Sequence, residues 1–439
     1  MADIRAKLEE WSLDRKLARN VASLYAVQVT SYLLPLITIP YLARVLGPAV
    51  WGLVAFAQAF AAYAGIAIEY GFHLSATRAV AAGRDCRTKL ADLAAGVMGA
   101  KFLLAAGVAA LAFLIEPRVP LFRNHPVYLW AAIFWAVAQS LSLLWYYQGV
   151  ERIRPAAVLD IIGKTAATAA IFILVRRPED GWRVLALQGC GAIFSVAVAA
   201  ALVYREIPFK LPTWRLTRNA LKMGWSMFLF RSSMSLYGAG NSFILGLLAA
   251  PEAVGFFAGA EKLARALMGL LVPVHQGLYP RMSHAVRHDR PRAFRLAKFS
   301  VIAMTSTGAV LSLAAFLAAP WAVPLILGKS FGASVPVLKV MAPLPLLDAV
   351  GTMLGVLWMV PLGLDRQFNK IVLAGGAFNI VLALVLAPRF AQIGMAVAVV
   401  STELLVVFSL YATLRRRKLS PLSSTHEEAS PKKGASHHT

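Results

Sequence analysis

Apolar runs of about 20 residues dominate the chain, and each is long enough for a helix to cross the ~30 Å hydrocarbon core of a bilayer. The first two runs, at 20–44 and 50–70, are separated only by the short segment PAVWG at 48–52. A connection this short, marked by Pro48 and Gly52, requires two helices to lie antiparallel. The sequence therefore predicts a transmembrane hairpin near its start.

Ten further runs of the same kind follow. We expect twelve membrane-spanning helices in all, at 20–44, 50–70, 90–115, 127–147, 156–175, 184–204, 221–248, 254–279, 297–319, 333–361, 369–387 and 392–414. Hydrophobic residues make up 59% of the 439 residues, which is too large a share for a soluble protein of this size. The expected fold class is an all-α integral membrane protein.

Two matches within the chain indicate an internal repeat. The segment PAVWGLVA at 48–55 aligns without gaps on PEAVGFFA at 251–258, and GVER at 149–152 matches GLDR at 363–366. The matches occur in the same order and at nearly the same offset. Because internal repeats are a common plan of secondary transporters, we expect two six-helix lobes around a central cavity.

The expected domain organisation follows from these runs and from the polar segments between them. The longest middle loop is basic and contains two prolines, and the end of the chain is polar and rich in serine and proline, which is typical of disorder. The predicted parts are a cytoplasmic N-terminal segment (1–19), an N-lobe (20–204), a basic inter-lobe loop (205–220), a C-lobe (221–414) and a disordered cytoplasmic tail (415–439).

The net charge of +23 is distributed unevenly. Loops that share a side with both termini hold most of the lysines and arginines. The opposite side has only Arg44, Arg118, Arg123, Arg176, Arg177, Arg183, Lys329 and Arg389. The positive-inside rule then places both termini in the cytoplasm. We interpret the basic excess as a topology signal and expect no nucleic-acid partner.

Several charged residues fall inside the predicted spans. The basic ones are Lys101, Lys164, Arg231, Lys262, Arg265 and Lys339, and the acidic ones are Glu69, Asp160, Glu261, Asp348 and Glu403. A charge near the bilayer centre costs roughly 2.5–3.5 kcal/mol on insertion scales, so such groups usually face a cavity or a partner. These residues are therefore the first candidates for a functional site.

Two acid–base pairs, Asp160/Lys164 and Glu261/Arg265, have the i,i+4 spacing that lets both side chains meet on one helix face. Each pair either neutralises itself inside the bundle or takes part in ion coupling. The ion-coupling candidates are Asp160, Lys164, Glu261 and Asp348.

Three basic residues, Arg231, Lys101 and Lys339, have no acidic neighbour at helical spacing. The two lysines either extend towards an interface or face a cavity, whereas Arg231 sits deep in its span. A cavity lined by arginine and lysine would attract an anionic group such as a diphosphate, which a guanidinium can bind through two hydrogen bonds.

Aromatic and amide side chains in or near the spans suit a carbohydrate, although tryptophan and tyrosine are also common at membrane interfaces. They are Tyr25, Gln28, Tyr32, Gln58, Tyr63, Trp145, Tyr146, Gln148, Tyr237, Asn241 and Gln276. The chain has no Walker loop, no dinucleotide fingerprint and no metal-ligand spacing, and its outer loops are too short for a catalytic domain. We therefore expect a transporter rather than an enzyme, with no cofactor and no metal.

Several motifs resemble one family. PLITIPYLARVLGPAVWGLVAFAQAF (35–60) and EYGFHLSATR (69–78) are similar to the opening hairpin of the bacterial O-antigen flippases, the Wzx-type polysaccharide transporters. YYQGVERI (146–153), AGAEKLARAL (258–267) and QGLYPRMS (276–283) are similar to patterns of that family and occur in the same order. The resemblance extends from about residue 20 to residue 414.

This resemblance implies a twelve-helix transporter of the bacterial cytoplasmic (inner) membrane that works by alternating access. Its implied substrate is an oligosaccharide linked to undecaprenyl diphosphate, with membrane lipids and other polysaccharide assembly proteins as further candidate partners. The family's use of cationic cavity residues is carried over to Arg78, Arg152, Lys262, Arg265 and Arg281, beside Arg231, Lys101 and Lys339. Three of these residues lie at the cytoplasmic ends of spans: Arg78, Arg152 and Arg281. There they either bind the substrate, act as topology signals or form contacts between the lobes.

Two other classes of function fit less well. A cation-coupled multidrug exporter of the same superfamily is the alternative, but its cavity should favour carboxylates over the lysines and arginines seen here. A membrane glycosyltransferase or polymerase would need a catalytic outer loop, which the sequence lacks. A scaffold role would leave the intramembrane charges unexplained.

Overall fold

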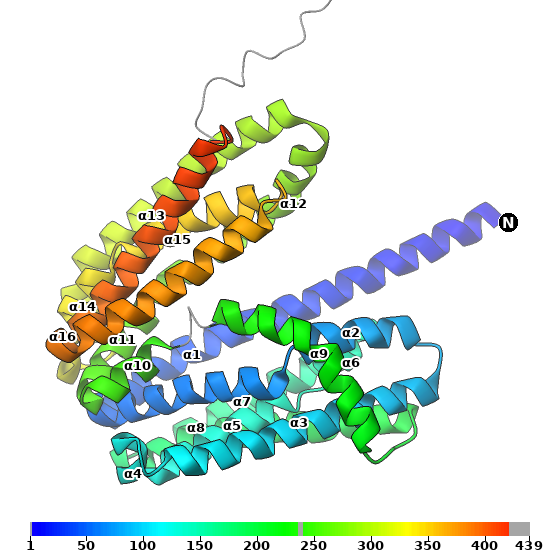
Figure 1. Ribbon diagram of the computed structural model, residues 1–439, viewed down its shortest axis with the longest axis horizontal. Helices are drawn as coiled ribbons and strands as arrows, with labels where there is room; N and C mark the ends of the chain where they lie inside the picture. The colour runs from blue at the N-terminus through cyan, green and yellow to red at the C-terminus, as the bar shows by residue number, and fades with distance from the viewer. Residues whose placement is uncertain (1, 236–239, 421–439) are drawn as a thin grey trace, which may run out of the picture. The chain divides into compact units, whose positions relative to one another are not determined.

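The computed structural model describes the backbone of residues 2–235 and 240–420, and the side chains of residues 30, 33–229 and 240–420. Within these residues the chain is helical, with no strand, which confirms the expected all-α class (Figure 1). The helices are α1 (Ala2–Glu69), α2 (Phe72–Gly83), α3 (Arg87–Ile115), α4 (Pro120–Asn124), α5 (Pro126–Ser140), α6 (Leu144–Gly149), α7 (Ile153–Leu174), η1 (Pro178–Asp180), α8 (Gly181–Glu206), α9 (Trp214–Ser235), α10 (Asn241–Leu248), α11 (Pro251–Gly269), α12 (Val272–His288), α13 (Arg290–Ile326), η2 (Lys329–Phe331), α14 (Ser334–Met341), α15 (Leu344–Thr352), the π-helical η3 (Met353–Met359) and α16 (Asp365–Arg416).

Counting the described residues only, eight helical runs are long and apolar enough to cross a membrane. Two of these runs each contain a reversal of the chain, because α1 is broken at Gly47 and α16 at Ala391. Large apolar side chains point outward from the helices, including Phe113 (68% exposed), Trp321 (73%) and Phe408 (66%). Such an exposed apolar surface is expected of helices that face lipid.

The chain packs as two compact units. The first comprises the chain up to Gly259 with 321–335 and 383–395, and the second comprises 260–320, 336–382 and the described part from 396 onward. These units are defined by packing and not by the sequence repeat, so the predicted lobe boundaries stay a prediction.

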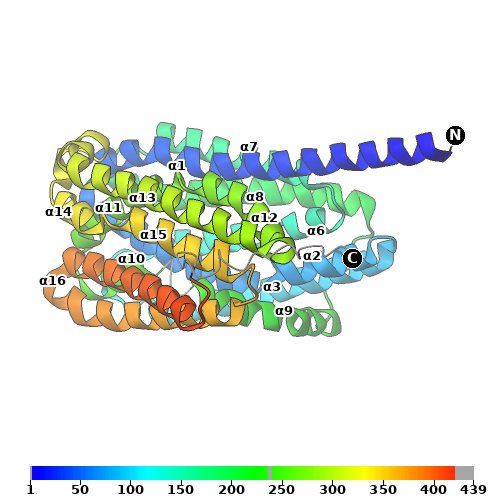
Figure 2. The same ribbon diagram turned by 90° about the horizontal axis from the view of Figure 1, so that it is seen from above.

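In the first unit, α3, α5, α7 and α8 run side by side (Figure 1), and α1 packs along α7 (Figure 2). α8 is a close neighbour of both α5 and α7, and all three helices contact α1. A second group of helices in this unit, α2, α3, α6 and α9, shares a core that includes Phe72, Val97 and Trp145.

The hairpin predicted at the start of the chain is present. α1 consists of two helices that meet at Gly47, whose φ of 69° is a conformation that favours glycine. Pro48 begins the returning helix, and Pro251 likewise begins α11. Proline suits this first position because the N–H that it lacks has no partner there.

The two copies of the repeated segment contact each other reciprocally within the first unit. A Cβ atom on Gly52 would collide with the carbonyl group of Pro251, and a Cβ on Gly255 would collide with the carbonyl group of Pro48. These four residues are the ones that the gap-free alignment pairs. The close approach of both backbones explains why the two positions hold glycine.

The second span ends at Glu69, close to its predicted end at residue 70, because Tyr70 and Gly71 have positive φ. The predicted loop at 71–89 is largely helical, because the Glu69 carboxylate accepts hydrogen bonds from the N–H groups of Gly71 and His73 and starts a new helix, α2. Two other predicted spans are divided where the sequence suggested continuous helix. The span expected at 127–147 is divided into α5 and α6 at residues 141–143, and the span expected at 254–279 is divided into α11 and α12 at residues 270–271.

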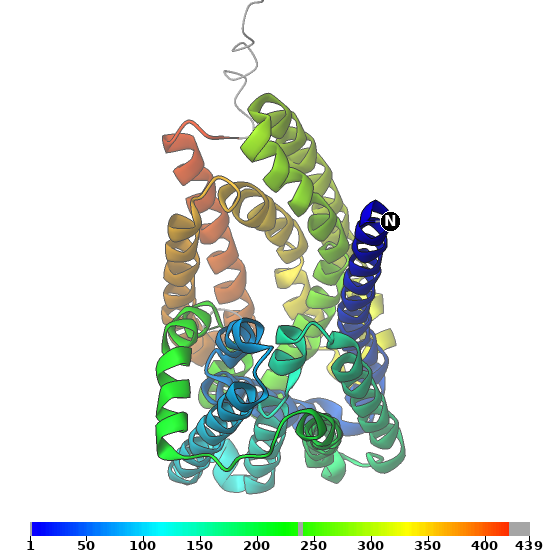
Figure 3. The same ribbon diagram turned by 90° about the vertical axis from the view of Figure 1, so that its right-hand side faces the viewer.

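In the second unit, α12 and α13 form a hairpin, and the two arms of α16 lie side by side (Figure 3). The arms of α16 touch at Gly375 and Val406, and Asn379 donates a hydrogen bond to the Thr402 hydroxyl at 3.4 Å. The helix is interrupted at Pro343 and Pro345, since α14 ends at Met341 and α15 begins at Leu344. The π-helical stretch η3 follows directly.

Candidate functional site

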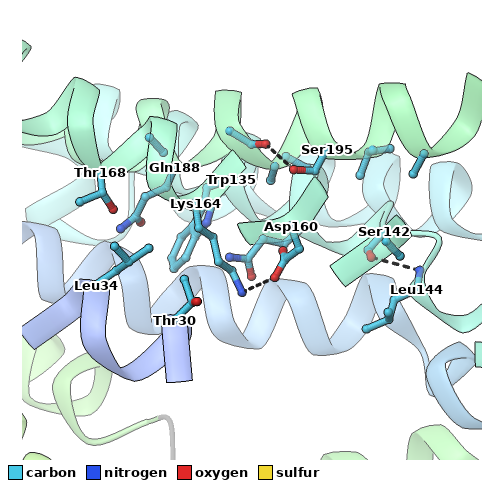
Figure 4. A pocket seen from close by; sticks show the side chains of 18 of the residues that line it. Thr30, Leu34, Trp135, Ser142, Leu144, Asp160, Lys164, Thr168, Gln188 and Ser195 are labelled. Atoms are coloured by element: carbon cyan, nitrogen blue, oxygen red, sulfur yellow. Dashed lines mark hydrogen bonds and ion pairs between the residues drawn. The ribbon is translucent and has the colours of Figure 1, made fainter. Parts of the chain in front are cut away.

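The first unit encloses a cavity of about 510 Å³ between α1, α5, α6, α7 and α8 (Figure 4). Its size lies within the range typical of small-molecule sites, about 300–1,000 Å³. The lining residues are Thr30, Leu34, Pro35, Thr38, Trp135, Ala138, Gln139, Ser142, Leu143, Leu144, Ala156, Ala157, Asp160, Lys164, Ala167, Thr168, Ile171, Gln188, Gly191, Ala192, Ser195, Val196 and Ala199.

The sequence produces this cavity through stripes of small and polar residues. On α8 the lining positions recur every three or four residues, as at Gln188, Gly191 and Ser195, which places them on one helix face. α7 presents a similar stripe that includes Asp160, Lys164 and several alanines. Glycine and alanine leave space between helices that larger side chains would fill.

α7 and α8 cross closely at one edge of the cavity. A Cβ on Gly163 would collide with the Gly191 carbonyl oxygen and the Ser195 hydroxyl, and a Cβ on Gly191 would collide with the Gly163 carbonyl oxygen. The Ser195 hydroxyl also donates to the carbonyl oxygen of Leu159 at 2.7 Å. Small residues of this kind let membrane helices approach each other. The crossing therefore sets the distance between the two charged residues of α7, Asp160 and Lys164, and the polar face of α8.

Among the lining residues whose side chains the structure describes, the charged groups are one acid–base pair. Lys164 Nζ lies 2.7 Å from Asp160 Oδ2, as the i,i+4 spacing predicts. The two side chains are 38% and 42% exposed, so they face open space and are not packed away. Figure 4 shows them beside Thr30 of α1 and Gln188 of α8. The charges of these described side chains cancel.

Uncharged polar groups complete the lining. Gln139 from α5 and Gln188 from α8 contribute amides, and Trp135 contributes an indole ring. The Oε1 atom of Gln188 is buried, and no described residue forms a hydrogen bond with it. Because a buried acceptor without a donor is unfavourable, this amide is suited to a ligand that donates a hydrogen bond.

Lys101 lies behind the cavity and does not line it. Its side chain is only 1% exposed, and Nζ donates to the carbonyl oxygen of Ser142 at 3.2 Å, where the chain passes from α5 to α6. The carboxylate of Glu69 acts on it electrostatically. Lys101, on α3, therefore forms a hydrogen bond at the break between α5 and α6 and interacts electrostatically with Glu69 at the end of α1.

Other candidates lie in the second unit. Arg265 donates to Glu261 Oε1 through Nη2 at 2.8 Å and through Nε at 3.2 Å, and its charge also acts on Asp348 of α15. Lys262 directly follows Glu261 on α11, and the Glu261 carboxylate acts on it electrostatically. Lys339 Nζ lies 5.5 Å from the centre of the Phe316 ring, a cation–π contact. Glu261, Arg265 and Asp348 thus form one charged cluster across α11 and α15.

The remaining cationic candidates are dispersed. Arg78 on α2 and Arg281 on α12 are exposed, and Arg152 forms an ion pair with Glu206 at 2.9 Å. The side chain of Arg231 lies outside the described residues. The predicted roles of all these residues in binding and coupling stay predictions.

Sequence reasoning missed most of the cavity lining. Gln139, Gln188, Ser195 and Trp135 were not selected, because each lies in a run that is otherwise apolar. A signal was present in α8, where Gln188, Gly191 and Ser195 share one face. Trp145, by contrast, is buried in the core at 2% exposed, and so is Tyr146, so neither occupies a membrane interface.

Comparison with known sequences gives consistent results. Residues 17–286 match the family model described as "Polysaccharide biosynthesis protein". A protein of Escherichia coli (strain K12) named "Putative O-antigen transporter" is 32% identical over 407 residues, which is 92% of this chain and 98% of the relative. A protein of Shigella dysenteriae with the same name is 26% identical over 399 residues, which is 90% of this chain and all of the relative.

Solved structures share the fold at low sequence identity. The "Lipid II flippase MurJ, inward closed conformation" matches with a TM-score of 0.67 at 11% identity, covering 90% of this chain and 87% of the other. An inward-facing multidrug resistance transporter of the MATE family, in the MOP superfamily, matches with a TM-score of 0.62 at 14% identity, covering 90% and 98%. The likeness places the chain's fold among those of membrane transporters. From the match to the family model, the chain belongs to the polysaccharide biosynthesis protein family.

Proposed function

We propose that this protein is a flippase that moves an oligosaccharide linked to undecaprenyl diphosphate from the inner to the outer leaflet of the cytoplasmic membrane by alternating access. Family membership and the printed names of the two sequence relatives support a transporter of polysaccharide precursors. The observation that carries the proposal is the polar cavity that membrane helices enclose in the first unit. Other polysaccharide assembly proteins would supply the substrate and receive the product.

The cavity addresses the main physical difficulty of such transport. Sugar hydroxyl groups lose their hydrogen bonds to water when they enter hydrocarbon, and each unsatisfied polar group costs several kcal/mol, on the order of 2–7. A protein that offers hydrogen-bonding groups along the path lowers this barrier. Asp160, Lys164, Gln139 and Gln188 provide such groups within an otherwise apolar bundle.

The diphosphate requires positive charge, which the proposal assigns to the cationic candidates. These are Arg231, Lys262, Arg265, Lys339, Arg78, Arg152 and Arg281. Lys101 is left out of this set, because it is 1% exposed and bonded to the Ser142 carbonyl. Arg265 supports this role because its side chain is 53% exposed while it holds Glu261, so a phosphate could replace the carboxylate. The acid–base groups Asp160, Lys164, Glu261 and Asp348 are proposed to couple transport to an ion gradient.

A genetic test compares charge-neutralising variants in a strain of the source bacterium that lacks this gene. Wild-type protein should restore the surface glycan, whereas Arg265→Gln and Arg231→Gln should restore little of it and cause the lipid-linked precursor to accumulate. Arg389→Gln is the matched control, because Arg389 is exposed on the side predicted to face away from the cytoplasm.

Restoration of normal surface glycan by both variants, at wild-type protein levels, would refute the assignment of the diphosphate to these cations. If wild-type protein instead failed to restore the glycan and conferred resistance to cationic drugs, the multidrug exporter would replace the flippase. A direct measurement uses proteoliposomes in which the glycan of the labelled lipid becomes accessible to an added lectin only after transfer between leaflets.

A further inference from the structure

The chemistry of the cavity in the first unit narrows what it binds. We propose that this cavity is a sugar subsite, which takes an uncharged, hydroxyl-bearing ring of the glycan and not the diphosphate. This inference rests on the proposed flippase function, since it divides one substrate between two places in the protein. It assigns to Asp160, Lys164, Gln139, Gln188 and Trp135 a task separate from that of the cationic candidates.

The charge of the lining argues against a phosphate. Lys164 is the cationic group among the lining residues, and its ammonium already lies 2.7 Å from the Asp160 carboxylate. A diphosphate placed at Lys164 would bring like charges close to Asp160, so attraction to one residue is offset by repulsion from the other. A neutral ligand does not meet this conflict.

The hydrogen-bonding groups match those of a sugar. A hydroxyl group both donates and accepts, so neighbouring hydroxyls on a ring need protein partners of both kinds. Asp160 accepts, Lys164 donates, and the amides of Gln139 and Gln188 do both. The buried Oε1 of Gln188 has no donor among the residues that the structure describes, and a sugar hydroxyl pointing towards α8 would supply one.

The walls of the cavity complete the match. Trp135 offers an indole ring, and Leu34 and Ile171 add apolar surface. A sugar ring has apolar C–H faces as well as polar edges, and the apolar face of an aromatic side chain suits the former. Figure 4 shows Trp135 and Gln188 together on one side of the Asp160–Lys164 pair. Polar groups and a flat apolar surface therefore face the same space.

A site for a monovalent cation at Asp160 is the main rival explanation. That site would require the cation to displace the Lys164 ammonium, and it would leave Trp135 and the unpartnered Gln188 oxygen without a role. Both readings predict that Asp160 matters. Only the sugar subsite predicts that replacing Gln188 weakens the binding of the glycan.

The test measures binding to the purified full-length protein in nanodiscs by isothermal titration. One probe is the repeat-unit oligosaccharide released from the surface polysaccharide of the source strain, without lipid or diphosphate. The other is undecaprenyl diphosphate without sugar. The variants are Gln188→Leu and the nearly isosteric Asp160→Asn, with Gln392→Leu as the matched control, because Gln392 on α16 does not line the cavity.

Oligosaccharide binding should weaken about tenfold or more in Gln188→Leu and Asp160→Asn, which corresponds to the loss of about one good hydrogen bond, and remain unchanged in Gln392→Leu. Binding of the sugar-free lipid should be the same in all four proteins. Thermal melting of each variant shows whether it is folded. If Gln188→Leu does not fold, Asp160→Asn still tests the proposal.

Unchanged oligosaccharide binding in folded Asp160→Asn would overturn the inference. So would a loss of sugar-free lipid binding in the same variant, which would place the diphosphate in the cavity. Binding of Na⁺ that depends on Asp160 while oligosaccharide binding does not would establish the rival cation site. Wild-type protein that binds the oligosaccharide but does not move the lipid between leaflets would refute the flippase and leave the subsite standing.

Discussion

Lys101 shows how a charge predicted for a cavity can serve a structural contact. Its ammonium is buried, bonded to the Ser142 carbonyl and influenced by Glu69. A buried charge in contact with the end of a helix is stabilised by the carbonyl groups there, which carry partial negative charge. Lys101 thus supports the break between α5 and α6, and it positions the part of the chain that brings Ser142 to the cavity.

We expect Lys101→Met to lower stability by about 2–4 kcal/mol, because the substitution leaves the Ser142 carbonyl and the Glu69 carboxylate without the ammonium. Thermal melting of the purified protein would measure this change. The double variant Lys101→Met/Glu69→Gln should recover part of the loss. Lys89→Met, at an exposed position of α3, is the control and should melt within about 0.5 kcal/mol of wild type. Equal melting of Lys101→Met and wild type would show that the contact contributes nothing.

Arg265 differs from Lys101 because it is largely exposed. Its side chain is 53% exposed, whereas that of its partner Glu261 is 15% exposed. Solvent weakens such a pair, and exposed ion pairs contribute roughly 0–1 kcal/mol.

Arg265→Gln should therefore change the free energy of unfolding by less than about 1 kcal/mol, even where it abolishes glycan export. Parallel measurements of melting and of surface glycan would separate the two effects. A large loss of stability would mean that the residue is structural, and the export defect could then not be assigned to substrate binding.

The helices in the first unit are held in place by close backbone contacts. Gly52 and Gly255, which the internal repeat pairs, each face the carbonyl group of the other copy's proline. This reciprocity means that the repeat has a structural counterpart: the two copies pack on one another through the same surface. Interfaces of this kind have no room for a side chain.

Gly52→Ala and Gly255→Ala should each destabilise the protein by about 1–3 kcal/mol, because the added methyl group would overlap a backbone carbonyl that cannot move freely. Melting temperature and yield after purification would report the effect. Gly107→Ala is the matched control, since nothing lies within 4 Å of the new methyl group. In the middle of α3 this change should be neutral or stabilising by up to about 1 kcal/mol.

A similar effect at Gly52 and Gly107 would contradict this explanation, because the loss would then reflect glycine in general and not the contact with Pro251. The double variant Gly52→Ala/Gly255→Ala also discriminates. If both residues pack at one crossing, the second substitution should cost less than the first, because the helices have already moved apart.

The orientation of the whole molecule in the membrane can be tested with its two cysteines. Cys86 lies between α2 and α3, in the part predicted to be cytoplasmic, and Cys190 lies within α8. A hydrogen bond from Thr88 lowers the pKa of the Cys86 thiol below its ordinary value, with a smaller effect from Lys89. A lowered thiol pKa increases the thiolate fraction near neutral pH, and the thiolate is the reactive form.

We expect a membrane-impermeant maleimide to label the protein quickly in inside-out vesicles and not in right-side-out vesicles or cells. Cys86→Ser should remove the labelling, and Cys190→Ser should leave it unchanged, because Cys190 is in the apolar part of α8. At a given pH near neutrality, the Cys86 rate should exceed that of an ordinary exposed thiol, because its lowered pKa gives a larger thiolate fraction. Labelling from the outside of cells would reverse the predicted orientation of both termini.

Much of the fold could be predicted from hydropathy and from turn residues. Most of the expected spans coincide with helices in the described residues, and the turn near Pro48 and the end of the second span are close to where they were expected. The break between α5 and α6 was not predicted. It contains the Ser142 carbonyl, which meets the Lys101 side chain of α3 only after the helices have packed.

The sequence by itself determined the membrane-spanning segments, the hairpin at Gly47 and the paired glycines, since apolar length and turn chemistry are local properties. The tertiary structure alone decided where polar groups meet. Three different helices contribute Gln139, Asp160 and Gln188. The sequence of an apolar run does not show which face of the helix contacts lipid and which contacts a neighbouring helix. That choice depends on small residues such as Gly163 and Gly191, whose contact sets the distance between α7 and α8.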